Sequence, residues 1–485
     1  MNAVSGDLLA KAERFDQADF GAVLAIAPLQ AGGPADDLRR LVADARDRWL
    51  VLAPAEALAL SGFRRAMQEA IHARPDVDVF YADDMALGET DPAHRLRLKP
   101  SFNLALLAAQ DYVGAPVVVR GSAFHRLGGL RPEMGEAAVY DLVLRAYAHG
   151  LGIERIARVL LAFPGARPET PVEARRRALE AWVGAGPLQA APGRTPGSLQ
   201  LARRFDAFPD VTLVIPTRQG GPAARPFVVE LLDSLAGTDW PMDRLKVLVG
   251  DDSDRAGTFP AGRWPFAVER LATPRPGGEP FNYAAKMNRL WRAAGTEHMV
   301  FVNDDVTVRA SGWLKALMTF AMDRDVGGVG ARLVFPDGRV QHAGVAGGLF
   351  GAAAHPWFGQ PPEAPTYQDW ALVHRDWSMV TGAVFATRRS VMESLGGFDE
   401  RFTLEFNDLD LCLRMRLLGL RIVYTPFAEL AHREKGSRGE TLPAGEEIAL
   451  FLNRWRAWLA DDPAYHPGLS RDRFAPEPVE AAPLA

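Results

Sequence analysis

The chain has 485 residues, a formal net charge of -5 and a pI near 6.1. This length predicts two or three domains, and the net negative charge argues against a broad nucleic-acid-binding surface. Hydrophobic residues make up 48% of the chain and charged residues 24%, which is typical of a folded protein with a large core.

The single cysteine, Cys412, excludes an internal disulfide and is typical of a reducing compartment. The first twenty residues contain acids and no apolar core segment, so no signal peptide is predicted. No apolar run approaches the roughly 18 residues that a membrane span needs. We therefore expect a cytoplasmic protein. Peripheral contact with the inner face of the cell membrane stays open, because it requires only a surface patch.

Residues 1–165 form the first predicted domain, and residues 166–207 form a helix and linker. This second segment combines a basic amphipathic helix, expected over residues 171–183, with a Pro- and Gly-rich sequence. The next domain is expected over residues 208–436. Residues 437–485 are predicted to hold one more helix, over residues 446–459, and a disordered tail.

Strands and helices alternate in the second domain at the spacing of βαβ units. Apolar strands are expected at residues 211–215 and 299–302, with another strand between them in the segment LKVLVGDDSD. Helices are expected over residues 226–235 and 282–294. This order predicts an α/β fold with a mostly parallel, Rossmann-like sheet and helices on both faces, which binds ligands at the carboxyl ends of its strands.

Paired acids follow two of these strands, Asp251-Asp252 and Asp304-Asp305. Adjacent carboxylates repel each other, and a Mg²⁺ or Mn²⁺ ion held by one or two carboxylates and substrate phosphates would offset that repulsion. Asp251 and Asp252 are suited to hydrogen-bonding a ribose or base. The alternative interpretation is that both pairs are solvated loop acids or helix caps.

Two further candidates lie in the segments FNDLDLCLRMR and AELAHRE. Asp408 and Asp410 precede a helix predicted over residues 411–418. We assign Asp410 to the helix cap and Asp408 to a general base that takes a proton from an attacking hydroxyl. The alternative for Asp408 is a second cap or an exposed acid. His432 is a candidate metal ligand, although a lone histidine is more often structural.

The two halves of the chain share an internal repeat. Each has an arginine, a Gly-Gly pair that ends nine residues later, an Asp-Leu-x-Leu-Arg segment, and a glycine nine residues after that aspartate. These residues are Arg120, Gly129, Asp141 and Gly150 in the first half and Arg388, Gly397, Asp410 and Gly419 in the second. Agreement at three spacings predicts a duplication. Extended backwards, the match aligns RWLVLAPAEAL with HMVFVNDDVTV.

Taken in order, several motifs resemble those of family 2 glycosyltransferases with a GT-A fold. They are VTLVIPT, VGDDSD, FNYAAKMN, FVNDDV, FPDGRVQHAGV, TGAVFATRRSVMESLGGFDERF, FNDLDLCLR and AELAHRE, over roughly residues 208–436. The resemblance implies an inverting transfer from a nucleoside-diphosphate sugar, usually a UDP- or dTDP-sugar, to a saccharide or lipid-linked acceptor. The implied products are cell-surface polysaccharide or O-antigen.

The resemblance also implies roles for single residues. Asp305 matches the family's metal contact, His432 its late histidine and Asp408 its catalytic base, with Mn²⁺ or Mg²⁺ as the ion. The positions that match contacts to the donor nucleotide are Pro216, Thr217, Asp252, Asn282 and Asp304. Trp377, just before a turn at Gly382, is a candidate for stacking on an acceptor sugar, although aromatic residues also fill cores.

The first half resembles the same family with its chemical positions replaced. By the spacings of the repeat, Ala53-Pro54-Ala55 stands in place of Asn303-Asp304-Asp305, Val139 in place of Asp408, and Phe163 in place of His432. The first domain is therefore predicted to be a partial, degenerate and inactive copy, which binds acceptor polymer or braces the active domain. Glu56, Asp83 and Asp84 are interpreted as solvated or capping acids.

Two other classes of protein remain open. A metal-dependent sugar nucleotidyltransferase also combines a nucleotide, a metal and paired acids on a parallel sheet. The segment IPTRQGGPAAR offers it Gly220-Gly221 and two arginines as a phosphate loop, without a lysine-rich signature after them. A non-catalytic protein that binds sugar nucleotides or polysaccharide is the third class, and the retained Asp305, Asp408 and His432 argue against it.

Overall fold

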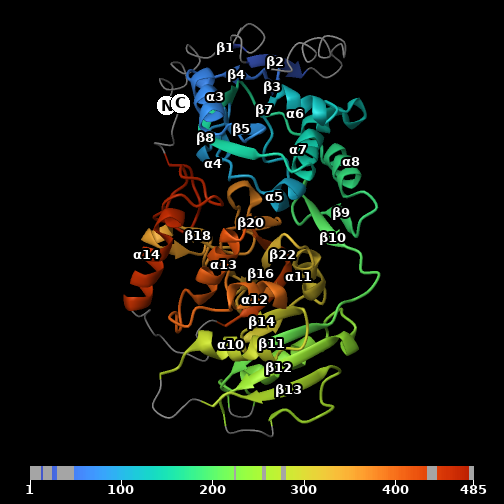
Figure 1. The fold of residues 1–485 in the computed structure, drawn as a ribbon, viewed down its shortest axis with the longest axis vertical. Helices are drawn as coiled ribbons and strands as arrows, with labels where there is room; N and C mark the ends of the chain where they lie inside the picture. Colours follow the sequence, from blue (N-terminus) through green and yellow to red (C-terminus); the bar gives the residue numbers. More distant parts are fainter. Residues whose placement is uncertain are drawn as a thin grey trace. The chain divides into compact units, whose positions relative to one another are not determined.

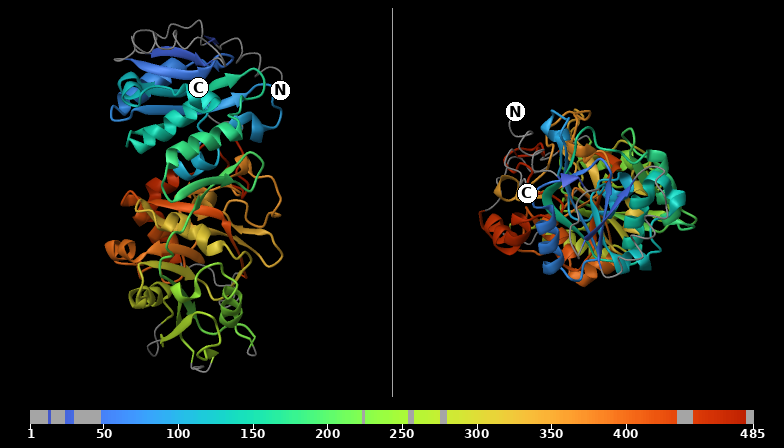
Figure 2. Two further views of the ribbon diagram at one scale, coloured as in Figure 1. Left: turned by 90° about the vertical axis from the view of Figure 1, so that its right-hand side faces the viewer. Right: turned by 90° about the horizontal axis from the view of Figure 1, so that it is seen from above.

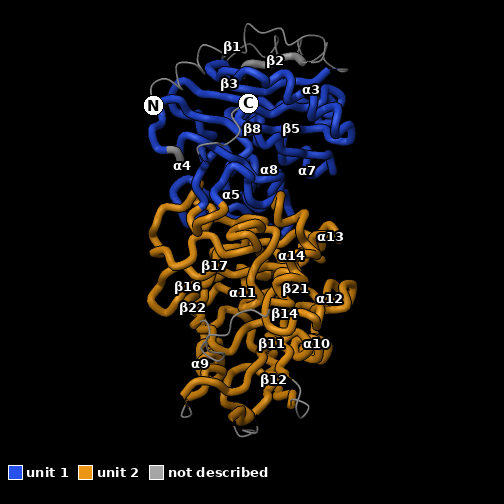
Figure 3. Tube along the Cα trace, turned by 90° about the vertical axis from the view of Figure 1, so that its left-hand side faces the viewer, with its two compact units in different colours: residues 1–201, 463–470, 476–485 blue, residues 202–462, 471–475 orange. Residues whose placement is uncertain are grey.

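The computed structural model describes residues 13–14, 24–29, 48–222, 225–253, 258–274, 280–433 and 445–479. The chain divides into two compact units, which Figure 3 colours separately. Unit 1 comprises residues 1–201, 463–470 and 476–485, and unit 2 comprises residues 202–462 and 471–475. Residues 166–201, which the sequence assigns to a helix and linker, therefore belong to unit 1.

Unit 2 is built on a mixed sheet in the order β13-β12-β11-β14-β21-β16-β22-β15. Its strands are β11 (Val211–Thr217), β12 (Leu245–Asp251), β13 (Ala267–Ala272), β14 (His298–Val302), β15 (Val306–Val308), β16 (Val326–Val334), β21 (Val384–Arg388) and β22 (Arg421–His432). The three predicted strands β11, β12 and β14 are parallel, as expected, and β13, which was not predicted, runs parallel to β12. These four strands lie side by side in Figure 1. The other half is not mostly parallel, because β21 runs antiparallel to both β14 and β16.

Helices connect these strands, and the short strands pair either with this sheet or with each other. They are α9 (Phe227–Leu235), α10 (Tyr283–Ala293), α11 (Trp313–Ala321), α12 (Arg389–Leu395), α13 (Asn407–Leu417), α14 (Gly445–Ala460), β17 (Val340–His342), β18 (Ala346–Gly347), β19 (Ala353–Ala354) and β20 (Arg375–Trp377). Strands β11, β12 and β14 are almost entirely buried, as the apolar sequence runs predict. The polar residues that follow them therefore come from strands whose positions are fixed by burial.

Unit 1 has its own sheet, in the order β1-β4-β8-β5-β7-β3-β2, with β6 paired to β5. Its strands are β1 (Glu13–Arg14), β2 (Leu24–Leu29), β3 (Trp49–Pro54), β4 (Leu58–Ala59), β5 (Val79–Ala86), β6 (Leu96–Arg97), β7 (Val117–Arg120) and β8 (Ile153–Phe163). Its helices are α3 (Phe63–Ala73), α4 (Pro92–Arg95), α5 (Leu104–Ala109), α6 (Gly121–Arg126), α7 (Ala138–Ala148) and α8 (Val172–Val183). A two-stranded sheet, β9 (Leu188–Pro192) and β10 (Leu199–Arg203), follows. Figure 2 shows the blue-green helices α7 and α8 in two further views.

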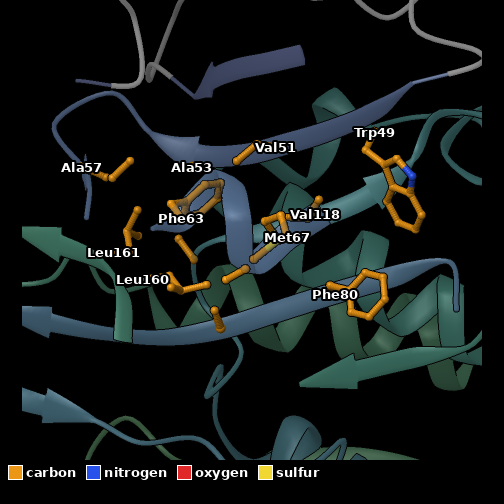
Figure 4. Packing of buried hydrophobic residues seen from close by; sticks show 14 of the residues in the cluster. Trp49, Val51, Ala53, Ala57, Phe63, Met67, Phe80, Val118, Leu160 and Leu161 are labelled. Carbon is orange, nitrogen blue, oxygen red and sulfur yellow. The ribbon is translucent and has the colours of Figure 1, made fainter. Parts of the chain in front are cut away.

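One core cluster of unit 1 lies between its sheet and α3. Figure 4 shows Trp49 and Val51 of β3, Phe80 of β5, and Phe63 and Met67 of α3 in this cluster. All five side chains are at most 5% exposed. The first half of the chain therefore retains a folded, well-packed domain although its chemical positions have changed.

The strand directions confirm that the two units share a duplicated fold. In unit 1, β2-β3-β7-β5-β8-β4 has the same sequence of parallel and antiparallel pairs as β11-β14-β21-β16-β22-β15 in unit 2. Within the described part of unit 1, no strand corresponds to β12 or β13. The first copy is thus partial, as predicted.

Buried ion pairs repeat as well. Arg145 Nε donates to Asp141 at 2.7 Å, and Arg414 Nε donates to Asp410 at 2.8 Å. The other guanidinium nitrogens donate to the carbonyls of Leu127 and Gly129 in unit 1, and to those of Leu395 and Gly397 in unit 2. Asp410 is therefore an ion-pair partner in the first turn of α13, and its assignment as a helix cap is wrong.

The strand register corrects the predicted alignment of the two copies by one residue. Trp49 pairs with Arg120, and His298 pairs with Arg388, so Trp49 is the counterpart of His298. Pro54-Ala55-Glu56 therefore stands where Asn303-Asp304-Asp305 stands. The position of Asp305 is held in unit 1 by a carboxylate, the exposed Glu56.

The other two replacements keep their predicted alignment. Leu58 pairs with Ala162, and Thr307 pairs with Ala431, so the following residues, Phe163 and His432, correspond. Val139 precedes Asp141 by the same two residues that separate Asp408 from Asp410. Unit 1 thus keeps an acid at one of these positions and has apolar side chains at the other two.

Asp83 and Asp84 are fully buried in β5, so their interpretation as solvated or capping acids is wrong. Asp84 forms ion pairs with Arg97, Lys99 and Arg167. Burial alone would raise the pKa of Asp84, but these three cations hold it below its usual range. Burial lowers the pKa of Lys99 to about 8. The cations come from separate segments, which the sequence does not bring together.

A C-terminal segment completes this buried network. His466 Nε2 lies 2.7 Å from Asp83 Oδ2, and both side chains are 0% exposed. Gly468 N–H donates to His466 Nδ1 at 2.9 Å, so Nε2 is the nitrogen that donates to Asp83. The N–H of Val479 then donates to the carbonyl of Gly468. The predicted disordered tail is therefore ordered as far as Val479, and residues 480–485 lie outside the described residues.

Among the residues that the structure describes, no helix combines the length and the apolar character of a membrane span. Cys412 is buried and free.

We predict that His466→Ala lowers the free energy of unfolding of unit 1 by about 1–3 kcal/mol, because it leaves the buried Asp83 carboxylate short of a donor. Chemical denaturation of the whole protein, followed by hydrogen exchange in β5, measures this loss. His94→Ala is the matched control, since the His94 side chain is exposed and pairs with exposed Asp91. Equal unfolding midpoints for wild type and His466→Ala would contradict the prediction.

Candidate active site

The first part of the site joins the ends of β11 and β14. Thr217, the last residue of β11, donates from Oγ1 to Asp304 Oδ2 at 2.6 Å. Both side chains are buried. Burial raises the pKa of Asp304 to about 6, with a further contribution from the neighbouring charge of Asp305. Pro216 precedes Thr217 in the buried strand, opposite Gly250.

The second acidic pair, at the end of β12, is held differently. Asp251 Oδ2 accepts from Gln219 Nε2 at 2.9 Å and from Arg270 Nε at 2.8 Å, while Oδ1 accepts from the N–H of Ser253. Both of its oxygens are thus occupied by protein donors in a buried position. Asp251 therefore organises the loop after β12.

Asp252 is tied to the first part of the site through Lys286 of α10. Lys286 Nζ lies 2.7 Å from Asp252 Oδ1 and donates to the carbonyl of Thr217 at 2.9 Å. Burial lowers the pKa of Lys286, although Asp252 and Asp304 oppose this shift. One cation therefore links the ends of β11 and β12 beside Asp304.

The third part of the site joins β15 and β22. His432 Nε2 lies 3.1 Å from Asp305 Oδ1, and His432 Nδ1 lies 2.6 Å from Gln341 Oε1. Gln341 Nε2 faces the carbonyl of His432, which leaves Oε1 to accept the Nδ1 proton. A neutral His432 ring then presents its Nε2 lone pair to a carboxylate oxygen. Two acceptors this close need a proton or a cation between them.

The residues present fit a divalent cation at this position. Two neighbouring ligands in an octahedral shell with bonds of about 2.1 Å lie about 3 Å apart, close to the separation of Asp305 Oδ1 and His432 Nε2. Among the described residues, no group of three or more His, Cys, Asp or Glu side chains is arranged to hold a metal. Asp305 and His432 would therefore supply two ligands, which leaves positions for substrate oxygens and water.

Asp408 lies at the start of α13 and connects to the same strand ends. Its Oδ2 accepts the N–H of Gly382 at 2.7 Å, and its Oδ1 accepts the N–H of Leu409. The next residue after Gly382, Ala383, accepts the N–H of Asn303 at 2.9 Å. One short backbone segment thus links Asp408 to the residue just before Asp304. Burial raises the pKa of Asp408, although these N–H donors oppose the shift.

Asn282 caps α10 and lies next to this assembly. Its Oδ1 accepts the N–H of Ala285 at 2.9 Å, and its Nδ2 donates to the carbonyl of Glu400. Its side chain therefore stabilises the start of the helix that carries Lys286.

The structure does not bring Trp377 to the site surface. Its side chain is 1% exposed, in β20, and Arg375 stacks on its ring at 3.9 Å. Since the ring is covered by protein, the proposed stacking of Trp377 on an acceptor sugar is wrong. Gly382 differs, because its N–H contacts Asp408 directly, and a Cβ there would lie 3.1 Å from Asp408 Cβ.

Sequence reasoning missed two residues of the site. Lys286 lies four residues after the cap Asn282, inside the motif FNYAAKMN. The available signal was a lysine between the apolar residues Ala285 and Met287, and the structure shows that it is buried. Gln341 lies in FPDGRVQHAGV, a strand whose partner becomes known only from the fold. Neither residue is visible from charge patterning alone.

The family model of the glycosyltransferase-like family 2 matches residues 209–455, half of the chain. The chain belongs to this family. The match covers the sheet of unit 2 and every residue of the site described above. The predicted α/β fold class, with a GT-A domain, is thereby confirmed.

Two curated relatives show what the chain is similar to. The O-antigen biosynthesis protein RfbC of Myxococcus xanthus is 33% identical over 82% of this chain and 32% of its own length. The N-acetylglucosaminyl-diphospho-decaprenol L-rhamnosyltransferase of Mycobacterium tuberculosis is 29% identical over 48% of this chain and 78% of its own. The chain thus spans about a third of the first relative.

Among solved structures, the mannosyltransferase PcManGT from Pyrobaculum calidifontis, in complex with GDP-Man and Mn²⁺, matches with a TM-score of 0.35 and 18% identity. The match covers 67% of this chain and 81% of that chain.

We predict that Gln341→Ala weakens Mn²⁺ binding by about 10- to 100-fold, because His432 loses the acceptor that fixes its tautomer. Electron paramagnetic resonance of free Mn²⁺ measures the affinity. Gln360→Ala serves as the control, since Gln360 contacts β17 through its backbone carbonyl, which the substitution retains. An unchanged Mn²⁺ affinity in Gln341→Ala would show that the Gln341 contact does not tune the ligand.

Proposed function

We propose that unit 2 is an inverting, metal-dependent glycosyltransferase that moves a sugar from a UDP- or dTDP-sugar to a saccharide or lipid-linked acceptor. We further propose that its products belong to cell-surface polysaccharide or O-antigen. The reaction would take place in the cytoplasm, with lipid-linked acceptors reached at the inner face of the membrane. Membership in family 2 and the names of the two relatives support this proposal.

The observation that carries the proposal is the assembly of three groups at the strand ends of one sheet. Asp304 is bound to Thr217, Asp305 faces His432, and Asp408 is linked to Asn303 through residues 382 and 383. The side chains that would contact a nucleotide, hold a cation and act as the general base therefore lie near one edge of the sheet, where parallel strands present their carboxyl ends.

The proposed reaction is a single displacement. Asp408 accepts the proton of an acceptor hydroxyl, and that oxygen forms a bond to the anomeric carbon of the donor. The bond from this carbon to the diphosphate breaks on the opposite face, and its electron pair leaves with the nucleoside diphosphate. Mn²⁺ or Mg²⁺, held by Asp305 and His432, would supply the positive charge that stabilises the leaving group.

On the same proposal, Thr217 and Asp252 contact the donor nucleotide and Asp304 orients its ribose. Lys286 would keep the neighbouring acids from repelling the diphosphate, since its ammonium lies between Thr217 and Asp252. Asp251 and Asn282 act by shaping the adjacent loop and helix.

We propose that unit 1 is catalytically inactive. Glu56 retains an acid at the position of Asp305, but Phe163 and Val139 replace the histidine and the base. At these positions, unit 1 offers a cation one carboxylate and no histidine. It also offers no side chain that could accept the proton of an acceptor hydroxyl at the position of Asp408.

We predict that Asp408→Asn lowers the rate of sugar transfer by about 10²- to 10⁴-fold, the usual contribution of a general base. The affinity for UDP with Mn²⁺ should stay within about threefold, because Asp408 contacts the acceptor. The assay measures release of nucleoside diphosphate from a panel of UDP- and dTDP-sugars with polyprenyl-diphosphate-linked saccharide acceptors. Asp337→Asn is the control, since Asp337 is exposed and pairs with Arg339.

Turnover by Asp408→Asn at the wild-type rate would remove Asp408 from the mechanism. Release of nucleoside monophosphate in place of diphosphate would instead favour a sugar nucleotidyltransferase.

The pH dependence follows from the raised pKa of Asp408. A general base acts as the carboxylate, so kcat/KM falls as the pH drops through the pKa of Asp408. Because burial raises this pKa, the acid limb should lie above the pKa of an ordinary aspartate. A pH–rate profile of the wild type tests this expectation, and an acid limb at or below the ordinary value would contradict it.

A further inference from the structure

We propose that Glu447, in the first turn of α14, is a positioning residue that holds residues 403–405 and thereby fixes Asp408 in the active site. This inference rests on the proposed function, since it takes Asp408 as the base. It assigns a task in the reaction to the C-terminal helix of unit 2, which contributes no group to the site described above.

Glu447 is buried, at 5% exposure, and its carboxylate accepts from the backbone just before α13. Oε1 accepts the N–H of Thr403 at 2.8 Å and that of Leu404 at 3.3 Å, and Oε2 accepts the N–H of Glu405 at 2.9 Å. The Thr403 hydroxyl also donates to Oε1. A buried carboxylate that accepts several N–H groups orders the backbone that carries them, because burying its charge is costly unless those hydrogen bonds are kept.

The same face of α14 fixes the residue that follows. Phe406 has φ 60°, a left-handed conformation that is costly for a bulky side chain. Its ring stacks on Phe451, with centroids 4.6 Å apart and planes at 21°. Phe451 lies four residues after Glu447, so both contacts come from one side of the helix. The strained turn into α13 is therefore held by α14.

A third contact lies one turn further along the helix. Arg454 Nη1 donates to Asp410 Oδ1 at 2.6 Å, and its Nη2 donates to Asp399 Oδ2 at 2.8 Å. Trp455 Nε1 donates to Asp410 Oδ1 at 3.0 Å. Helix α14 thus holds the segment on both sides of Asp408.

The direction of Asp408 depends on this segment. Asp408 is the second residue of α13, and from that position its carboxylate accepts the N–H of Gly382. If residues 403–406 shift, the start of α13 shifts with them, and a misplacement of about 1 Å at a reacting group can cost about 100-fold in rate. Loss of Glu447 should therefore lower kcat and leave donor binding intact, because Thr217, Asp305 and His432 lie on other elements.

The test is Glu447→Gln, with Glu446→Gln as the matched control on the exposed side of the same turn. The amide keeps the size of the side chain but sets an NH₂ group against one of the backbone N–H donors. Three quantities are measured on the whole protein: kcat with the most active sugar nucleotide of the panel, the affinity for UDP with Mn²⁺ by calorimetry, and hydrogen exchange of residues 403–410.

We expect kcat of Glu447→Gln to fall on the order of tenfold, with UDP affinity within threefold and faster exchange confined to residues 403–410. Glu446→Gln should match the wild type, and Glu447→Asp should recover part of the rate. If Glu447→Gln does not fold, Phe451→Leu weakens the same support at Phe406 and should lower kcat in the same way.

A kcat within threefold of the wild type would overturn the proposal. A loss of UDP affinity as large as the loss of kcat would also overturn it, since that pattern is that of a purely structural residue. The Asp408→Asn variant separates this failure from that of the proposed function. If Asp408→Asn is inactive and Glu447→Gln is not impaired, only the inference about α14 fails. If Asp408→Asn turns over normally, the proposed function fails.

Discussion

Two adjacent carboxylates, Asp304 and Asp305, lie nearly buried where β14 ends. Each needs its own compensation, because like charges repel strongly where water is excluded. Asp304 finds it on one side, in the Thr217 hydroxyl and the nearby charge of Lys286, and its pKa still rises to about 6. Asp305 turns the other way, toward the ring of His432. On the proposed function, this arrangement places Asp304 on the nucleotide side of the site and Asp305 on the cation side.

The rest of unit 2 maintains this division. Buried parallel strands fix the two acidic ends, and the antiparallel strand β21 brings residues 382 and 383 against Asn303. Asp408 reaches the same place from α13, whose start is held by contacts from α14. Unit 1 repeats the strand order from β11 to β15, without β12 and β13, and it repeats the buried Asp–Arg pair. Phe163 and Val139 stand where the histidine and the general base would be. The strand order and the Asp–Arg pair, which both units share, are thus features of the fold. The histidine and the general base, which unit 1 lacks, are features of the proposed chemistry.

The sequence predicted those features that depend on local patterns. The buried strands, the helices after them and the repeat follow from apolar periodicity and glycine spacing, and α10 and α14 begin within a residue of their predicted starts. Features that depend on distant segments were missed or wrong. Asp83 and Asp84 read as exposed because their cations and His466 come from elsewhere in the chain. Trp377 read as a surface residue because Trp357, whose ring packs against it, comes from an earlier segment of the chain. The one-residue error at Glu56 arose because strand register is set by pairing, which spacing alone does not show.

The central claim is that Asp305 and His432 bind a cation that in turn binds a diphosphate. Calorimetric titration of UDP and dTDP into the wild type and Asp305→Asn, each with Mn²⁺ and with EDTA, tests it most directly. We predict that the wild type binds at least one of the two diphosphates with Mn²⁺, and that its affinity falls at least tenfold with EDTA or in Asp305→Asn. Equal affinity under all of these conditions, or no binding to either diphosphate, would contradict it.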